Sequence, residues 1–218
     1  MYDEEYYLYR ESTRDFRIEA ELLFRLLSPR PGHRILEVGC GGGALLSFLE
    51  SRGFEAVGVD ISDEAVRLAA RAAPRSRVVR ADASELPFED ASFERLVSHH
   101  LVEHLPDPPA ALVEWKRVLA PGGQMAICTP NRLYPSPRIF DDPSHLRVYD
   151  RRELTEAVAG AGFEVKESFT IFPHLGRDRI SVALGVPLYR LFVSLPYFRG
   201  RGRSIMLSAT APWGGKAL

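Results

Sequence analysis

The sequence predicts an α/β fold in which a mostly parallel, doubly wound sheet carries helices on both faces. Two observations predict it. Short apolar strand-like segments alternate with helical segments along the 218 residues, which is the order of a parallel sheet with crossover helices. A glycine cluster, GCGGG at 39–43, separates the first strand-like segment from the next helix. The chain length predicts one domain, 1–218.

The helical segments are recognised by apolar spacing and by end signals. In the first, residues 15–27, apolar side chains recur on one face, and two prolines follow it. Ser62, Asp107 and Asp150 are expected to begin three further helices, because their side chains can accept hydrogen bonds from a first turn. One more helix is expected at 44–51, closed by Gly53.

The strand-like segments are short apolar runs between turn signals. We expect strands at 34–38, 54–59, 77–80, 93–98, 124–128 and 163–171. In a sheet of this type, ligands bind beyond the carboxyl ends of the strands. The glycine loop follows the first strand and therefore belongs to that edge.

The glycine loop by itself leaves the ligand open. Gly39-Cys40-Gly41-Gly42-Gly43-Ala44 fits the G-x-G-x-x-G/A pattern of dinucleotide sites, and Asp60 ends the next strand, where an acid can hold ribose hydroxyls. On these features a nicotinamide-dependent oxidoreductase is a fair interpretation, although a lone glycine motif is weak evidence. The Walker pattern of nucleotide triphosphatases is absent from the sequence.

Three further features favour another cofactor. Glu37 lies inside the first strand, two residues before the glycines. Asp82 follows the third strand, where its carboxylate and the amide of Ala83 could bind the edge of an adenine. Residues 92–131 then run from an apolar strand through an E-H-L-x-D-P turn to a helix, the sequence R-V-L-x-P-G-G and another strand.

At this point the sequence resembles a known family, the class I S-adenosylmethionine-dependent methyltransferases, in the branch of the ubiquinone and menaquinone methyltransferases. The segments that carry the resemblance are LEVGCGGG, VGVD, ADASELPFEDASF, LVEHLPDP, RVLAPGG and HLRVYDRREL followed by AGF. They cover roughly residues 33–165 in the order and at the spacing of the family.

The resemblance implies a Rossmann-like sheet of seven strands whose last strand, at 204–211, is antiparallel. It implies S-adenosylmethionine as cofactor and S-adenosylhomocysteine as product. The expected cofactor-binding residues are Glu37, Gly39, Gly41, Gly43, Asp60, Ile61, Asp82, Ala83 and His99. In this family the glycine loop packs on the methionine part, the acid at Asp60 binds ribose, and Ile61 packs on adenine. Glu37 could equally be a strand-end acid that accepts hydrogen bonds from loop amides.

The implied reaction is methyl transfer to a small-molecule acceptor, and a hydrophobic quinol, phenol or lipid-linked molecule is the acceptor class we expect. A hydroxyl or carbon-acid acceptor must lose a proton, and histidine is the usual base. The expected catalytic residues are His145, in a loop that often borders the acceptor in relatives, and His100. The alternative for each histidine is a packing or loop role.

The segment HLVEH, 100–104, also matches the H-x-x-E-H signature of a zinc-protease group. In that interpretation His100 and His104 would share a helix face. Pro106 and Pro108 leave little helix to carry the ion, and the same residues fit the connector of the methyltransferase family. We therefore predict no metal site here. Cys40 is expected to be a small loop residue.

Two segments outside the motifs carry expectations of their own. Residues 1–30, with Tyr6, Tyr7 and Arg17, are expected to form a lid over the cofactor. Residues 172–203 form an apolar, basic insertion before the last strand. One interpretation is a cap helix that packs on the sheet or on a second subunit. The other is that 177–203 form a surface that contacts lipid or an anionic bilayer.

Global properties narrow the function classes. The formal net charge is −1, which does not favour nucleic acid as a partner. Two cysteines, the lack of a signal peptide and the lack of a long apolar run predict a cytoplasmic protein. Two alternatives remain beside the methyltransferase: a nicotinamide oxidoreductase, and a methyltransferase-like protein that binds without turnover.

Overall fold

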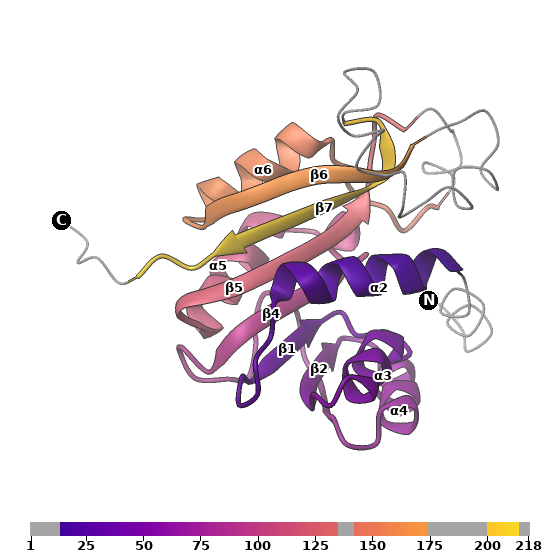
Figure 1. Cartoon of the computed structure of the whole chain (residues 1–218), viewed down its shortest axis with the longest axis vertical. Coiled ribbons are helices and arrows are strands. Elements are labelled where there is room, and N and C mark those ends of the chain that lie inside the picture. Colours follow the sequence, from indigo (N-terminus) through magenta and orange to yellow (C-terminus); the bar gives the residue numbers. More distant parts are fainter. Residues whose placement is uncertain (1–13, 135–141, 174–199, 214–218) are drawn as a thin grey trace.

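The computed structural model describes residues 14–134, 142–173 and 200–213, and shows one seven-stranded sheet between two layers of helices (Figure 1). Tyr6 and Tyr7 of the expected lid, and residues 174–199 of the expected insertion, lie outside the described residues. The strands are β1 (Ile35–Val38), β2 (Ala56–Asp60), β3 (Arg77–Arg80), β4 (Phe93–His99), β5 (Leu119–Pro130), β6 (Glu164–Pro173) and β7 (Gly202–Thr210). The helices are α2 (Arg14–Leu27), α3 (Ala44–Ser51), α4 (Asp63–Ala72), η1 (Val102–His104), α5 (Pro108–Val118) and α6 (Arg151–Gly160).

The strand order is β3-β2-β1-β4-β5-β7-β6. The pairs among β1 to β5 are parallel, whereas β7 runs antiparallel to both of its neighbours, β5 and β6. This confirms the predicted seven-stranded sheet with an antiparallel last strand. It also differs from the six-stranded order 3-2-1-4-5-6 of dinucleotide-binding proteins, because β7 is inserted between β5 and β6.

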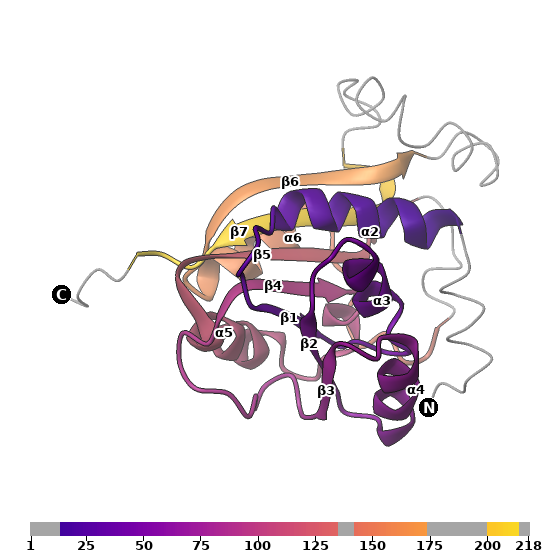
Figure 2. The ribbon, with the colours of Figure 1, turned by 60° about the horizontal axis from the view of Figure 1, so that its bottom comes forward.

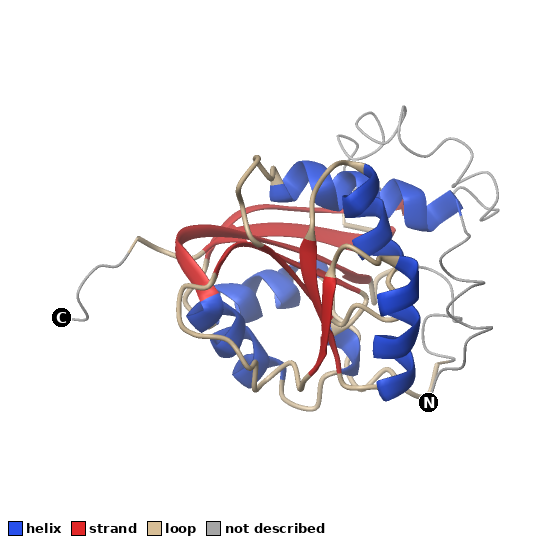
Figure 3. Cartoon of the chain, turned by 90° about the horizontal axis from the view of Figure 1, so that it is seen from below, coloured by secondary structure: helices blue, strands red, loops and turns tan. Residues whose placement is uncertain are grey.

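The two faces of the sheet are covered by different helices, as Figures 2 and 3 show. Alternating strand residues divide the core: Leu36 and Leu96 pack with α5 and α6, whereas Ile35 and Val97 pack with α2, α3 and α4. The division follows from the two-residue period of a strand, which sends neighbouring side chains to opposite faces. Each face of the one sheet thus carries one apolar cluster, and the two clusters together form the core.

Helix α2 lies across the middle of one face, against β4, β5 and β7 (Figure 2). The four residues of its predicted apolar face are all buried: Phe16, Ala20, Leu23 and Leu27. Arg17 lies on the exposed side of the helix. Helix α2 therefore joins the N-terminal part of the chain to the C-terminal strand.

The predicted helix starts are confirmed by their caps. The side chains of Ser62, Asp107 and Asp150 each accept a hydrogen bond from a first-turn amide, and Asp150 with Glu153 forms a full capping box. The main difference from the sequence analysis is β5, which begins at Leu119 rather than at 124. The APGG segment is extended because Leu119 pairs with Phe93 before an irregularity in β4 shifts the register.

Among the described helices, none has the length and apolarity that a crossing of a lipid bilayer requires.

The glycine before α3 is required by packing, and this can be tested. Gly43 has φ 90°, and a Cβ atom on it would lie 2.6 Å from the Cα atom of Ala69 in α4. Gly53 has φ 84°, but a Cβ atom there would meet no atom within 4 Å. We expect Gly43→Ala to lower the free energy of unfolding by about 1–3 kcal/mol more than Gly53→Ala, because it adds overpacking to the shared backbone strain. Urea unfolding followed by tryptophan fluorescence measures both, and equal losses would contradict this account.

Candidate functional site

The candidate site lies along one edge of the sheet, at the carboxyl ends of β1, β2 and β4. Strand β1 leads into the glycine loop, β2 ends at Asp60, and β4 ends at His99. The three strands are adjacent and parallel, so their carboxyl ends meet at the same edge.

The glycine loop is held to this edge by backbone hydrogen bonds. The amides of Gly39 and Cys40 donate to the carbonyl of Val59, at 2.8 and 2.9 Å, and the Gly41 amide donates to Asp60 Oδ2 at 3.0 Å. At Gly39 the backbone is left-handed, with φ 77°, and an added Cβ atom would lie 2.8 Å from the Leu101 side chain. The glycine is therefore needed for packing, a reason the sequence analysis did not include.

The acid at the end of β2 is placed to bind hydroxyl groups. Asp60 accepts from the Gly41 amide through Oδ2 and from the Ser62 amide through Oδ1, at 3.0 Å each. A carboxylate has about four acceptor positions, so two remain for ligand hydroxyls. Next to it, the side chain of Ile61 is 62% exposed, an apolar surface on which a flat ring could pack.

The loop after β3 has a fixed carbonyl and an exposed carboxylate. Asp82 Oδ1 accepts from the amide and the hydroxyl of Ser84, at 2.8 and 2.6 Å, and these bonds lower the pKa of Asp82. The indole of Trp115 donates to the carbonyl of Ala83 at 3.0 Å, which ties the loop to α5. Binding of an adenine edge by Asp82 and the Ala83 amide stays a prediction.

Glu37 lies in β1, buried at 2% exposure, two residues before the glycine loop. Its position is the one that the sequence analysis expected. A role toward the cofactor stays a prediction for this residue, as it does for the other cofactor-binding residues and for His99.

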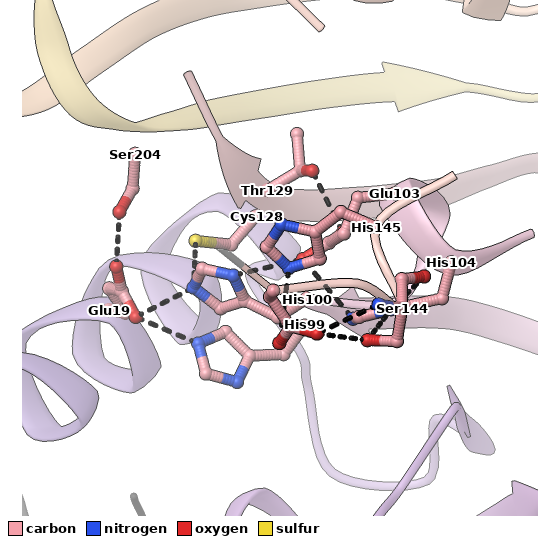
Figure 4. Close-up of polar contacts among 11 residues, drawn as sticks. Glu19, His99, His100, Glu103, His104, Cys128, Thr129, Ser144, His145 and Ser204 are labelled. Carbon is pink, nitrogen blue, oxygen red and sulfur yellow. Dashed lines mark hydrogen bonds and ion pairs between the residues drawn. The ribbon is translucent and has the colours of Figure 1, made fainter. Parts of the chain in front are cut away.

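Beyond the end of β4 the structure brings two histidines and two glutamates into one polar cluster (Figure 4). Glu19 Oε2, from α2, lies 2.9 Å from His99 Nε2 and 3.2 Å from His100 Nε2. The other ring nitrogen of His100, Nδ1, lies 3.2 Å from Glu103 Oε1. His100 therefore connects two carboxylates, both of which are buried.

The cluster continues to the loop that carries His145 (Figure 4). Thr129 donates to Glu103 Oε2 at 2.9 Å, while His104 Nδ1 lies 3.0 Å from the carbonyl of Ser144. The His145 ring packs on the His104 ring, with 4.8 Å between the centroids, and its Nε2 lies 3.8 Å from Asp142 Oδ2. The two histidines predicted as catalytic, His100 and His145, thus belong to one connected group.

The charges of the two glutamates are stabilised by the histidines. Burial by itself would raise the pKa of both carboxyls. The contacts with His100 and His99 instead hold the pKa of Glu19 well below its usual value. His100, with a contribution from His104, lowers the pKa of Glu103 to about 2. Both residues are therefore anionic at neutral pH.

A left-handed backbone at His100, with φ 54°, explains why two consecutive histidines reach the same glutamate. In a regular strand, His99 and His100 would point to opposite faces of the sheet. The unusual backbone ends β4 and turns the His100 ring toward α2. Such a conformation costs a non-glycine residue about 1–3 kcal/mol, so it is typical of functional sites.

Four residues of the cluster were not expected from the sequence: Glu19 and Cys128 contact the histidines, whereas Thr129 and Ser204 donate to the glutamates. Only Glu19 had a signal: it lies three residues after Phe16 and four before Leu23, within the apolar face of its helix. The zinc-protease arrangement is not formed, because residues 102–104 are a single 3-10 turn and His100 precedes it.

A comparison with protein families agrees with this geometry. Residues 36–127, which include β1 to β4 and most of β5, match a family model described as a methyltransferase domain. Over these residues the chain is similar to methyltransferase domains.

Relatives of the chain carry names of the same kind. The chain is 32% identical over 168 residues to a protein of Mycolicibacterium smegmatis named a probable S-adenosylmethionine-dependent methyltransferase, covering 76% of this chain and 65% of that protein. It is 33% identical over 115 residues to a ubiquinone biosynthesis O-methyltransferase of Paracidovorax citrulli, covering 49% and 47%. The chain thus spans between about half and just under two thirds of the length of these relatives.

Among solved structures, the chain is similar to the geranyl diphosphate C-methyltransferase of Streptomyces coelicolor, which was crystallised with Mg²⁺, geranyl diphosphate and S-adenosylhomocysteine. The TM-score is 0.70 at 18% identity, and the match covers 90% of this chain and 79% of that one. At this identity the likeness shows the fold alone.

The hydrogen bond from Ser204 to Glu19 connects β7 to α2 and can be tested by stability. The Ser204 hydroxyl donates to Glu19 Oε1 at 2.5 Å, and both residues are buried. We expect Ser204→Ala to lower the free energy of unfolding by about 1.5–3 kcal/mol, the range for hydrogen bonds to charged groups.

Ser98→Ala is the matched control for this substitution. Ser98 is also buried in a strand, and its hydroxyl has no hydrogen-bond partner among the described residues. Its removal is expected to change stability by less than about 0.5 kcal/mol. Urea unfolding followed by circular dichroism compares the two variants, and equal losses would show that the Glu19 contact contributes nothing of its own.

Proposed function

We propose that the chain transfers a methyl group from S-adenosylmethionine to a small-molecule acceptor. One observation carries the proposal. Three segments are expected to bind the cofactor: 39–43, 60–61 and 82–83. They lie at the carboxyl ends of the adjacent parallel strands β1, β2 and β3, at one edge of the sheet. All three lie within residues 36–127, which match the methyltransferase family model. The antiparallel β7 argues against the nicotinamide alternative.

The residues of the edge suit this cofactor. The glycine loop offers backbone amides and no charged side chain, which fits an amino-acid group better than a pyrophosphate. Asp60 has acceptor positions for ribose hydroxyls, Ile61 offers an exposed apolar face, and Asp82 has a second carboxylate oxygen, Oδ2, that makes no hydrogen bond among the described residues. When bound, the cofactor supplies an electrophilic methyl group.

We propose an apolar hydroxyl compound, such as a phenol or quinol, as acceptor. The similarity to a ubiquinone biosynthesis O-methyltransferase over about half of the chain supports this class. An exposed apolar side chain next to the histidine cluster supports it as well: Leu146 follows His145, its amide donates to the carbonyl of Glu103, and its side chain is 61% exposed.

His145 is our candidate for the base that removes the acceptor proton. Of the two histidines predicted as catalytic, His100 already has both ring nitrogens within 3.2 Å of carboxylate oxygens. His145 lies in a loop that two hydrogen bonds fix to the carbonyl of Glu103, from the amides of Leu146 and Arg147. His145 would take the proton that the acceptor hydroxyl loses when it is methylated.

The proposed location and partners of the protein rest on its sequence. We propose a cytoplasmic enzyme without a nucleic-acid partner. Contact of residues 177–203 with lipid or a second subunit stays a prediction, because nearly all of that segment lies outside the described residues.

Titration calorimetry with S-adenosylhomocysteine, and with NADH in parallel, tests the cofactor. We expect the first to bind and the second not to bind. Asp60→Ala should weaken S-adenosylhomocysteine binding more than tenfold, because the ribose hydroxyls lose a charged acceptor. Asp63→Ala is the control: Asp63 is three residues away, its side chain is 85% exposed, and affinity should stay unchanged. Binding of NADH alone would overturn the proposal.

Methyl transfer from labelled S-adenosylmethionine, screened with apolar phenols and quinols, tests the base. With any acceptor found, His145→Gln should lower kcat by about 10²-fold or more. Its affinity for S-adenosylhomocysteine should stay near that of the unmodified chain. A variant with full kcat would exclude His145 as the base, and a chain that binds cofactor but methylates no acceptor would favour a binding protein.

A further inference from the structure

We infer that Glu19, His99, His100 and Cys128 form a binding site for one divalent transition-metal ion, of which Zn²⁺ is the best match. One donor atom of each residue lies within 4.8 Å of the donor atoms of the other three. The residues come from α2, from β4 and the position after it, and from β5 (Figure 4). The inference does not rest on the proposed methyl transfer.

The separations between donor atoms suit a tetrahedral ion. With bonds of about 2.0–2.2 Å to nitrogen and oxygen and about 2.3 Å to sulfur, neighbouring ligand atoms of tetrahedral Zn²⁺ are roughly 3.3–3.6 Å apart. In the structure Glu19 Oε2 lies 2.9 Å from His99 Nε2 and 3.2 Å from His100 Nε2, and Cys128 Sγ lies 3.8 Å from His100 Nε2. These three separations are within a few tenths of an ångström of the tetrahedral values, and the other pairs of donor atoms lie within 4.8 Å.

The types of donor exclude the common hard cations. Two imidazoles, one thiolate and one carboxylate are ligands for Zn²⁺ and its neighbours in the transition series, whereas Mg²⁺ and Ca²⁺ take oxygen donors. Four protein ligands without an open position are typical of structural zinc sites. Such an ion would fasten α2 to the middle of the sheet.

The second layer of contacts fits a metal site as well. Histidine ligands usually direct their other ring nitrogen to a carboxylate or carbonyl, which fixes the ring. His100 does so: its Nδ1 lies 3.2 Å from Glu103 Oε1, and Glu103 is held in turn by Thr129. The oxygen of Glu19 that does not face the histidines accepts from Ser204 at 2.5 Å.

The charges balance around a divalent ion. Glu19 and Cys128 are buried, at 4% and 0% exposure. The carboxylate and a thiolate carry two negative charges, and two neutral imidazoles add none, so an ion of charge +2 makes the group neutral. On binding, the ion displaces the thiol proton of Cys128 to solvent. Burying a charged group is costly unless such a partner is present.

A neighbouring group is the competing location. Glu103, His104 and His145 also offer donor atoms within 4.8 Å of one another. We favour the first group because it has a fourth ligand and a thiolate, and because Glu103 already serves it by orienting His100.

Cobalt substitution distinguishes these possibilities, because a thiolate bound to Co²⁺ gives a charge-transfer absorption in the near ultraviolet that nitrogen and oxygen ligands do not give. The full chain is purified, stripped with a chelator and titrated with Co²⁺ and with Zn²⁺. The chain has two cysteines, Cys40 and Cys128, both buried. We expect one equivalent of metal per chain, the charge-transfer band in Cys40→Ser, and its loss in Cys128→Ser.

The Cys40→Ser variant decides the question even if Cys128→Ser does not fold, since any thiolate band in it must come from Cys128. Glu19→Gln and His99→Gln should weaken Zn²⁺ binding by about 100-fold or more, and Ser204→Ala, outside the ligand set, by about 10-fold or more. His145→Gln should leave the band intact. Failure to bind one equivalent of Co²⁺ or Zn²⁺, a band that disappears in Cys40→Ser, or metal binding that His145→Gln abolishes would each overturn the inference. None of these readouts involves methyl transfer, so they are separate from the tests of the proposed function.

Discussion

The contacts of the buried Glu19 carboxylate hold together the edge of the sheet at which the parallel strands have their carboxyl ends. It receives His99 and His100 through one oxygen and Ser204 through the other, and so joins α2 to β4 and to β7, 185 residues along the chain. A buried charge is stable only with such partners. These contacts therefore fix the position of helix α2 on the sheet, next to the edge that carries the glycine loop.

The part of the site that sequence could predict is the part built from local structure. Asp60 and Ile61 end a strand, and the glycines join a strand to a helix, so periodicity and end signals place them without knowledge of distant contacts. The same holds for the caps at Ser62 and Asp150. The histidine cluster is different, because its partners Glu19 and Cys128 are 80 and 28 residues away from the histidines. The pairing of β4 with β5 brings Cys128 to the histidines, and the packing of α2 on the sheet brings Glu19.

His100 shows why the motif HLVEH was ambiguous. Its spacing fits two histidines on one helix, but the backbone at His100 is left-handed and the helix is reduced to the turn 102–104. The motif therefore contributes to two groups rather than to one: His100 faces Glu19 and Cys128, whereas His104 faces Ser144 and the His145 loop. The sequence predicted no metal site, and the proposed zinc site departs from that prediction; only one of its ligands, His100, belongs to the motif.

The turn at His100 also connects the cluster to the cofactor edge. Leu101, the next residue, occupies the space that a Cβ atom on Gly39 would need. The same backbone that brings the His100 ring to Glu19 thus brings an apolar side chain onto the glycine loop. A left-handed histidine costs about 1–3 kcal/mol, and the two carboxylate contacts of its ring are the interactions available to offset that cost. One residue of unusual backbone conformation thus positions both the His100 ring in the cluster and Leu101 behind the glycine loop.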